Sequence, residues 1–529
     1  MLRSWAFDAT ALALILAAVQ GCGSNSSSAK PDASTGVDGS TDAGTEAGEA
    51  GPDCGSMPPT GTQVAASTDP AVILTMTGDD HVVYEDLTTQ EIYGVAAGGG
   101  GGKPSDIGKM LSQQTAVWAH GAAFLYLPTA ASESSAYAPL SAWTAANGTS
   151  VISKSAVAWD SYLSTYDASK DGQYVVYFAT TDGLTATLTV STIDGKTQTP
   201  LVPGIDLTGQ GMSGTFGPLC WPPMVQFVND TVVAQYCLPP VAAADAGADA
   251  GTPAETATIA TFTAPSFAPV TFATTFPPPT GSLPVDPTGK TVLLLDPSGT
   301  GLSLYPLSGA SPVTVDATGV AGLFTATGDL LYLTTGGSLA RYTAASGTTT
   351  TLVPNGIAAA FDVSPDGTWL QAASQQNATT GLTDLLLAST TTPGPANHVV
   401  KTATIQPAGF TADSQFSLIA GNFPANFHFG VVNFDLEASK TSGGAASKVL
   451  TVAGVLLPTT GSKVVCNTNY SPSTGGADIV SIDLSTTAPP TTLVTQANQH
   501  VFGTSTKKIV YSWSCNENAM AGIWVLTPP

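Results

Sequence analysis

The residues of this chain that could do chemistry are few, and cysteines lead them. The 529 residues include six cysteines, at Cys22, Cys54, Cys220, Cys237, Cys466 and Cys515. Cys22 directly follows an apolar run at the N-terminus, where a thiol is available for lipidation. The later cysteines suit disulfides in an exported protein. The sequence therefore predicts modified or cross-linked thiols before it predicts catalysis.

Two motifs begin like ligand-binding loops and then depart from them. Residues 98–103 read GGGGGK, but Ala97 occupies the first required glycine position and Pro104 follows the lysine, where a phosphate loop needs Ser or Thr. Residues 167–172 read DASKDG like the start of a calcium loop, but Phe178 stands where a bidentate Glu is required. We interpret the first motif as a loop and the second as a turn.

Histidines and nucleophile motifs give no further chemistry. The histidines are His81, His120, His398, His428 and His500. Their spacing does not suit a metal, and the sequence has no H-E-x-x-H, C-x-x-C or G-x-S-x-G motif. We therefore predict no metal, no cofactor and no catalytic residue, although groups distant in sequence can still converge in a fold.

The N-terminus has the pattern of an export signal. Residues 11–19, ALALILAAV, are apolar but shorter than the ~20 residues that a membrane span needs. Val19-Gln20-Gly21-Cys22 resembles the bacterial lipobox, with Gln20 in place of the usual small residue. The resemblance implies a signal peptide at 1–21 and lipidation of Cys22. Because Gly23 rather than Asp follows Cys22, it also implies an outer-membrane lipoprotein, facing either the periplasm or the surface. Ordinary secretory cleavage is the alternative.

Composition changes along the chain and limits the class of partner. Residues 22–60 are rich in Ser, Gly, Ala and Asp, and we predict that they form a disordered acidic tether. The whole chain carries a formal net charge of -23, which argues against nucleic acid as a partner because phosphate binding needs clustered Lys and Arg. No later apolar run is long enough to span a bilayer. The sequence predicts contact with a membrane through the lipid anchor alone.

A repeated pattern organises the rest of the chain. A polar turn precedes a short β-rich strand at 77–87, 119–128, 167–178, 227–236, 286–296, 325–335, 362–373, 411–421, 459–468 and 503–514. The first, second and fourth of these ten stretches are weaker matches. Further short strands lie between them. The predicted turn residues are Asp171, Gly172, Gly289, Gly328, Asp366 and Gly367.

Some of these repeats carry a family resemblance. SPDGTWL (364–370) and SKDGQYVVYF (169–178) are similar to the turns of TolB-like, WD40-like repeats. The resemblance implies an all-β fold, a single β-propeller of four-stranded antiparallel blades at 61–529 with a low-complexity loop at 238–256. We expect eight blades, with seven as the next count, and assign two of the weaker turns to insertions. A pair of smaller β domains is possible. The last blade lacks a strand, which the segment after Cys54 could supply.

The positions of the cysteines allow two disulfides. Cys220 and Cys237 lie in adjoining strands of one predicted hairpin, and Cys466 and Cys515 occupy similar places in the last two repeats. We propose both pairs, with Cys54 left over and buried free thiols as the alternative. The tryptophans lie mostly within strand patterns, which favours packing between blades over a stacking platform for a ligand.

Three functions of different classes fit these features. The first is a tethered, non-enzymatic and monomeric propeller, which presents its loops or central channel as a binding scaffold to an envelope protein or a glycan. The second is a propeller hydrolase or lyase, which predicts paired carboxylates with raised pKa in a central funnel. The third is a passive envelope or surface-coat component. The lack of a catalytic motif places the binding scaffold first.

Overall fold

The structure is a computed structural model that describes most of the chain from residue 59 to residue 528. It leaves out 67–70, 87–88, 100–102, 110–117, 129–136, 158–164, 208–222, 239–255, 274–283, 296–300, 375–383, 402–405, 422–433, 453–455, 472–475, 504–507 and 514–520. The predicted signal peptide, Cys22, nearly all of the predicted tether and the core of the 238–256 loop lie outside the described residues.

The first half of the chain forms five groups of strands, which we call blades 1 to 5. Blade 1 is β2 (Ala71–Met76), β3 (His81–Asp86), β4 (Glu91–Ala96) and β5 (Ser105–Lys109). Blade 2 is β6 (Trp118–His120), β7 (Ala123–Tyr126), β8 (Tyr137–Thr144) and β9 (Gly148–Val157). Blade 3 is β10 (Tyr166–Ala168), β11 (Tyr174–Ala179), β12 (Thr185–Thr192) and β13 (Gln198–Asp206). Blade 4 is β14 (Met224–Val228), β15 (Thr231–Leu238), β16 (Thr256–Thr263) and β17 (Ala268–Ala273). Blade 5 is β18 (Thr291–Leu295), β19 (Leu302–Pro306) and β20 (Val313–Asp316).

The second half repeats the arrangement in blades 6 to 10. Blade 6 is β21 (Gly319–Phe324), β22 (Leu330–Thr334), β23 (Leu339–Thr343) and β24 (Thr348–Val353). Blade 7 is β25 (Ile357–Val363), β26 (Trp369–Ser374), β27 (Asp384–Ser389) and β28 (Asn397–Lys401). Blade 8 is β29 (Gln406–Phe410), β30 (Phe416–Gly421), β31 (Phe434–Lys440) and β32 (Ser447–Val452). Blade 9 is β33 (Leu456–Pro458), β34 (Lys463–Ser471), β35 (Gly476–Asp483) and β36 (Thr491–Ala497). Blade 10 joins β37 (Gln499–Gly503), β38 (Lys508–Trp513) and β39 (Gly522–Leu526) to β1 (Thr62–Ala66).

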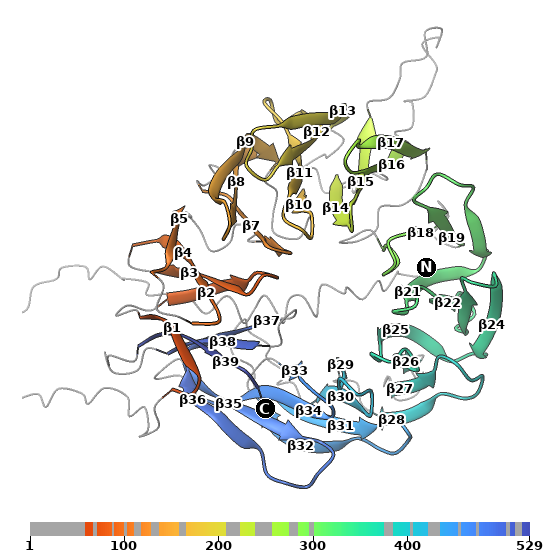
Figure 1. The fold of residues 1–529 in the computed structure, drawn as a ribbon. Coiled ribbons are helices and arrows are strands. Elements are labelled where there is room, and N and C mark those ends of the chain that lie inside the picture. The colour runs from red at the N-terminus through yellow and green to blue at the C-terminus, as the bar shows by residue number, and fades with distance from the viewer. Residues whose placement is uncertain are drawn as a thin grey trace, which may run out of the picture.

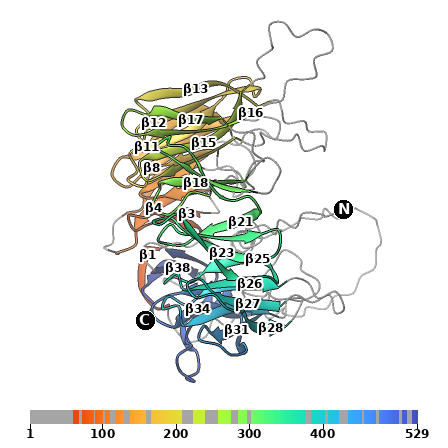
Figure 2. The ribbon, with the colours of Figure 1, turned by 90° about the vertical axis from the view of Figure 1, so that its right-hand side faces the viewer.

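The blades are antiparallel meanders arranged in a ring, the architecture of a β-propeller (Figure 1). The first strand of each blade lies toward the centre of the ring and the last strand lies outside. Figure 2 views the ring from its side and shows the sheets following one another along it. Blades 2 and 3 join into one eight-stranded sheet through the pairing of Ala156 with Ala179. In blade 5 an isolated bridge between Val285 and Val292 stands in for the innermost strand.

The described residues confirm the all-β propeller and raise the number of blades from the predicted eight to ten. Each of the ten turn stretches joins the first strand of a blade to its second, so the weaker stretches are blade turns and not insertions. They were hard to recognise because their turns differ in type. In blade 4, for example, Val228 pairs with Thr231 around a two-residue turn, and Asn229 rather than glycine takes the positive φ of 54°.

Apolar contacts between neighbouring blades form the core. Ten clusters of buried residues occupy the described part of the ring. Nine of them combine residues of two consecutive blades, and the tenth adds Val157 of blade 2 to residues of blades 3 and 4. Strand β22 shows how this arises, because Leu331 and Leu333 pack toward blade 7 whereas Leu330 and Tyr332 pack toward blade 5. The second strand of a blade is therefore buried on both of its faces, which explains the continuous apolar runs in the sequence.

Tryptophans contribute to these seams, as predicted. Trp143 is 2 % exposed in the seam between blades 1 and 2, and a Cβ on Gly94 would lie 2.5 Å from its ring. Trp513 and Trp524 are buried in the seam between blades 9 and 10. In these three positions the indole ring serves packing.

The N-terminal strand closes the ring. β1 pairs antiparallel with β39, with Thr62 opposite Val525 and Gln63 opposite Trp524. It also packs Val64 into the seam shared by blades 10 and 1. The prediction that the segment after Cys54 supplies the missing strand is confirmed, and the exposed edge of blade 10 is thereby covered. No helix in the described part of the chain is long and apolar enough to cross a membrane.

Gly522 provides a test of this closure. Its φ is +147°, and a Cβ at this position would lie 2.1 Å from the carbonyl oxygen of Ala65 in β1. We expect Gly522→Ala to lower the free energy of unfolding by about 2 kcal/mol or more, because the strands must separate to relieve the overlap. Gly394→Ala is the matched control, since a Cβ there meets nothing within 4 Å. Urea unfolding of both variants checks this, and an equal midpoint for the two would contradict it.

Candidate functional site

The turns between the first and second strands of the blades all lie at one end of the ring, because the strands of every blade run in the same order. We call this set the turn ring. The predicted turn residues Asp171, Gly172, Gly289, Gly328, Asp366 and Gly367 all belong to it. The four predicted glycines have positive φ, between 68° and 85°, which glycine adopts without steric cost.

The turn of blade 7 shows the local chemistry. The Ser364 hydroxyl donates to Asp366 Oδ1 at 2.6 Å and accepts the N–H of Trp369 at 2.9 Å. The N–H of Gly367 donates to the Ser364 carbonyl at 2.7 Å. A hydroxyl, a carboxylate and a glycine at fixed spacing therefore close the turn without help from the rest of the protein. Ser169 and Asp171 repeat the hydroxyl–carboxylate bond at 2.6 Å in blade 3.

Other turns reach the same shape with different residues. In blade 5 Asp286 takes the place of the serine and accepts the N–H of Thr288 at 2.7 Å and the hydroxyl of Thr291 at 2.6 Å. In blade 8 Ser414 takes the place of the glycine, with a φ of 61°. The residues 167–172, which begin like a calcium loop, form one of these turns, and their carboxylates accept protein hydrogen bonds.

Neighbouring turns also bond to one another. The N–H of Gly78 donates to the carbonyl of Gly121 at 2.5 Å, which joins blades 1 and 2. The Ser462 hydroxyl of blade 9 donates to Asp413 Oδ2 of blade 8 at 2.6 Å. Lys508 of blade 10 forms an ion pair with Asp80 of blade 1 across the closure. The turn ring is therefore a connected rim and not a set of independent loops.

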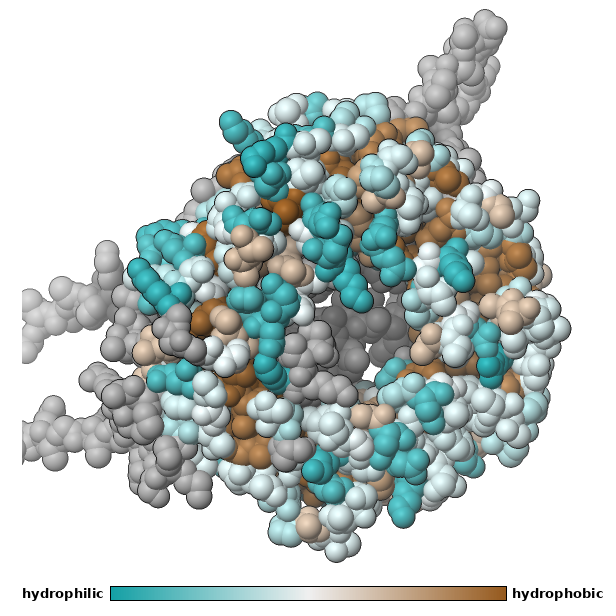
Figure 3. Space-filling model, viewed as in Figure 1, coloured by the Kyte–Doolittle hydropathy of each residue, from teal (hydrophilic) through white to brown (hydrophobic). Residues whose placement is uncertain are grey.

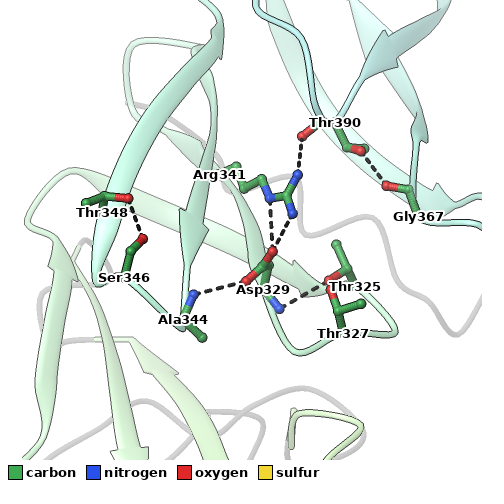
Figure 4. Close-up of polar contacts among 9 residues, drawn as sticks. All are labelled: Thr325, Thr327, Asp329, Arg341, Ala344, Ser346, Thr348, Gly367 and Thr390. Carbon is green, nitrogen blue, oxygen red and sulfur yellow. Dashed lines mark hydrogen bonds and ion pairs between the residues drawn. The ribbon is translucent and has the colours of Figure 1, made fainter.

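The only arginine beyond Arg3 fixes the rim between blades 6 and 7 (Figure 4). Arg341 Nε lies 3.1 Å from Asp329 Oδ2, Nη2 donates to the same oxygen, and Nη1 donates to the carbonyl of Thr390 at 3.1 Å. Thr390 in turn donates its hydroxyl to the carbonyl of Gly367. The Asp329 side chain is 10 % exposed, and its Oδ1 accepts the N–H of Ala344 at 3.0 Å. One guanidinium thus links two turns.

Hydrogen bonds lower the pKa of several turn carboxyls. Partial burial alone would raise the pKa of Asp366 and Asp413, but hydrogen bonds from hydroxyls and backbone N–H groups outweigh it and lower both values. Ser364 is the main donor to Asp366, and Ser462 is the main donor to Asp413. These turn carboxylates are therefore ionised structural acceptors with little remaining capacity for a ligand.

One carboxyl near the rim behaves differently. Asp362 lies on the innermost strand β25, two residues before Ser364, and its side chain is exposed. Desolvation by the surrounding protein raises the pKa of Asp362 above its usual value, and the hydrogen bond from the N–H of Val363 only partly offsets this. The sequence signal was present, because D-x-S-x-D-G occurs at 167–172 and again at 362–367, but the first aspartate of the motif was not singled out.

The cysteine predictions have different outcomes. Cys466 is a free, fully buried cysteine, so its predicted disulfide with Cys515 is wrong. The physical reason is strand alternation. Cys466 faces blade 8, whereas its neighbour Val465 faces blade 10, and in the sequence Cys515 stands between β38 and β39 of blade 10. Burial raises the pKa of the Cys466 thiol to about 12. Cys54, Cys220 and Cys515 lie outside the described residues, and the pairing of Cys220 with Cys237 stays a prediction.

The arrangement can bind polar or charged groups around a central opening. Figure 3 views the ring along its axis and shows hydrophilic side chains around that opening. Among the described residues no three His, Cys, Asp or Glu side chains are close enough to hold a metal ion. Desolvation raises the pKa of Asp362, which makes this carboxyl the candidate functional residue of the opening.

Arg341 yields a prediction about stability. We expect Arg341→Lys to lower the free energy of unfolding by about 1–3 kcal/mol, because one ammonium group cannot reach Asp329 and the Thr390 carbonyl together. The control is Lys196→Met, which removes an exposed pair with Asp194 and should change the free energy of unfolding much less than Arg341→Lys does. Urea unfolding compares the two variants. Unchanged stability of Arg341→Lys would show that the pair does not hold the rim.

The lowered pKa of Asp413 predicts acid sensitivity. A carboxyl with a lower pKa in the folded protein stabilises the fold above its unfolded pKa of ~3.9, and this contribution is lost as pH falls through the folded value. Asp413→Asn should therefore be less stable than wild type at pH 7, and the difference should shrink below pH 4. Asp106→Asn, on the outer strand β5, is the control for loss of charge. Unfolding midpoints at pH 7 and pH 3 measure the effect, and a difference independent of pH would contradict it.

Comparison with known proteins finds distant structural likenesses only. The chain matches no protein-family model and no curated protein sequence. A crystal structure of the eukaryotic initiation factor is similar with a TM-score of 0.46 at 11 % identity, covering 75 % of this chain and 91 % of that one. TolB from Acinetobacter baumannii gives 0.26 at 13 % identity over 59 % and 77 % of the two chains. The β-propeller domain of the Trilobed protease from Pyrococcus furiosus gives 0.29 at 10 % identity over 58 % and 92 %. These likenesses are distant, and it is the ring of antiparallel sheets that assigns this chain the fold of a β-propeller.

Proposed function

We propose that this protein is a lipoprotein of the bacterial outer membrane whose β-propeller acts as a binding scaffold for an envelope protein or a glycan. Cys22 carries the lipid, residues 22–60 form the tether, and the propeller presents its rim and central opening to the partner. The protein binds as a monomer and performs no catalysis in this role. The propeller face, rather than the anchor, determines the partner.

The N-terminal residues support the envelope location. A short apolar run ending in Val19-Gln20-Gly21-Cys22 fits export and lipidation, and two acyl chains would be enough for stable anchoring. The chain enters the propeller through β1, an outermost strand. A tether attached there leaves the central opening accessible. The net charge of the whole chain, -23, also opposes contact with anionic lipid head groups.

The observation that carries the scaffold proposal is the connected rim around the opening. Hydrogen bonds and ion pairs join the turns of neighbouring blades, for example Ser462 to Asp413 and Lys508 to Asp80. Apolar seams hold the blades behind them. A surface fixed in this way binds without a large cost of ordering, which is the property that a scaffold needs.

A hydrolase or lyase is the second candidate, and Asp362 is the observation in its favour. A raised pKa is common among catalytic acids. Glycoside hydrolysis, however, needs two carboxyl groups at a defined separation. Asp362 alone does not make such a pair, and we therefore rank binding above catalysis.

A comparison of wild type with Cys22→Ala in intact cells tests the proposal. After mild crosslinking and pulldown, we expect a specific partner to be enriched with the lipidated protein and lost with the variant, which should be released from the membrane. Lipid labelling of both proteins controls for the modification itself. If the variant stays membrane-bound, or if nothing is enriched with either protein, the tethered scaffold is wrong and screening against glycan, ester and peptide substrates follows.

A further inference from the structure

Asp362 lies where two innermost strands depart from regular pairing. In blade 7 the register between β25 and β26 shifts between Ala360 and Asp362. In blade 8 the register between β29 and β30 shifts between Pro407 and Phe410. Such bulges re-aim side chains and are frequent beside functional sites. The paired irregularities leave the Asp362 carboxyl at the inner end of the seam between blades 7 and 8.

Asp167 occupies the same place in its own repeat and shows what the structural role requires. Asp167 Oδ1 accepts the N–H of Ala168 at 2.7 Å, just as Asp362 Oδ1 accepts the N–H of Val363 at 2.8 Å. Asp167 Oδ2 then accepts the N–H of Phe227 in the next blade at 2.7 Å, and the side chain is only 4 % exposed. This aspartate therefore uses Oδ1 within its own strand and Oδ2 to join blades 3 and 4.

Asp362 cannot join its neighbour in the same way. The adjacent residue of blade 8 is Gly409, whose N–H donates to Gln371 Oε1 at 3.2 Å. Gln371 also donates to the Gly409 carbonyl and to the Ser417 hydroxyl, so a buried amide already makes the link that Asp167 makes elsewhere. Among the described residues, none donates to Asp362 Oδ2. Within the described residues this oxygen therefore makes no hydrogen bond between blades 7 and 8.

Small residues keep the oxygen accessible. A Cβ on Gly409 would lie 3.0 Å from Asp362 Oδ2, and the φ of Gly409 is +84°. Ala358 on the same strand is exposed, and Ala360 and Ala408 are half-buried. These four described neighbours therefore place no large side chain beside the carboxyl.

The ionised form of Asp362 weakens the fold instead of supporting it. Its pKa is raised in the folded protein, so folding favours the protonated form, and stability falls as pH rises from the unfolded pKa through the folded value. An asparagine would avoid this cost. A charge that the fold does not use and that costs stability is typical of a functional group.

We propose that the Asp362 carboxylate is a cation-binding group at the mouth of the central opening and that it receives the ammonium or guanidinium group of a basic polypeptide segment. This inference rests on the proposed binding function and specifies the partner. Charge complementarity supports it, because the chain carries 38 acidic and 15 basic residues and its rim includes Asp79, Asp171, Asp230, Asp366 and Asp413. Such a field repels polyanions and attracts basic chains.

Peptide binding to the purified protein tests the inference. The probes are a fluorescein-labelled ten-residue peptide of alternating Lys and Gly and its Ser and Gly counterpart, both measured by anisotropy at low and moderate salt. We expect the lysine peptide to bind, and Asp362→Asn to weaken it about tenfold, since a hydrogen bond to a charged group is lost. Asp362→Glu should retain most of the affinity. Asp106→Asn removes the same charge from the outer strand β5 and should change little.

Either of two results would overturn the inference. Equal binding of the serine peptide would show that the opening does not select cations. Equal weakening by Asp362→Asn and Asp106→Asn would show that only overall charge matters. The intact-cell pulldown separates this failure from failure of the scaffold, because a partner that is still captured by Asp362→Asn keeps the scaffold and removes the opening as its site.

A stability measurement on the same variant checks that Asp362 has no structural role. We expect Asp362→Asn to melt at or above the wild-type temperature at pH 7, with the difference vanishing near pH 3, where both side chains are neutral. A variant that melts well below wild type at pH 7 would make Asp362 a structural residue like Asp167, and the proposal would fall.

Discussion

The packing of each second strand against two neighbouring blades is the constraint on which this structure depends. One blade cannot bury both of its faces, so every blade requires a neighbour on each side, and the sequence of such contacts is complete only when the last blade meets the first. Strand β38 illustrates the point, since Ile509 and Tyr511 pack toward blade 9 and Val510 packs toward blade 1. The pairing of β1 with β39 makes that last contact possible.

This constraint determines what the sequence could reveal. Continuous apolar runs after polar turns identify strands that are buried on both faces, and these runs predicted the all-β ring and its closure. The number of blades was harder to predict because a blade needs only some tight reversal before its second strand. Asn229 with a positive φ and Ser414 in place of glycine satisfy that need as well as an Asp-Gly turn does. A count that relies on one turn type therefore misses blades.

The cysteines and Asp362 show where sequence reasoning stops. Cys466 and Cys515 hold similar places in their repeats, yet alternation along β34 turns Cys466 away from blade 10. A repeat position fixes the strand but does not fix which neighbour a side chain meets once bulges intervene. Asp167 and Asp362 share a motif, and the next blade determines whether the aspartate bonds across the seam. Asp167 accepts the N–H of Phe227 in the next blade, whereas the N–H of Gly409, next to Asp362, donates to Gln371 instead.

The same comparison explains how a repeat fold gains a functional group. In a ring of similar blades, a residue that serves structure in one repeat becomes available for binding when a neighbouring side chain takes over its hydrogen bond. Gln371 does this for blades 7 and 8 through Gly409, Ser417 and Leu418. An ionised Asp362 that pairs with a cation breaks no link between the blades, because Gln371 already makes that bridge. Function in such a propeller is therefore expected where the seam between two blades carries a redundant link, and in this chain that seam is the one between β25 and β29.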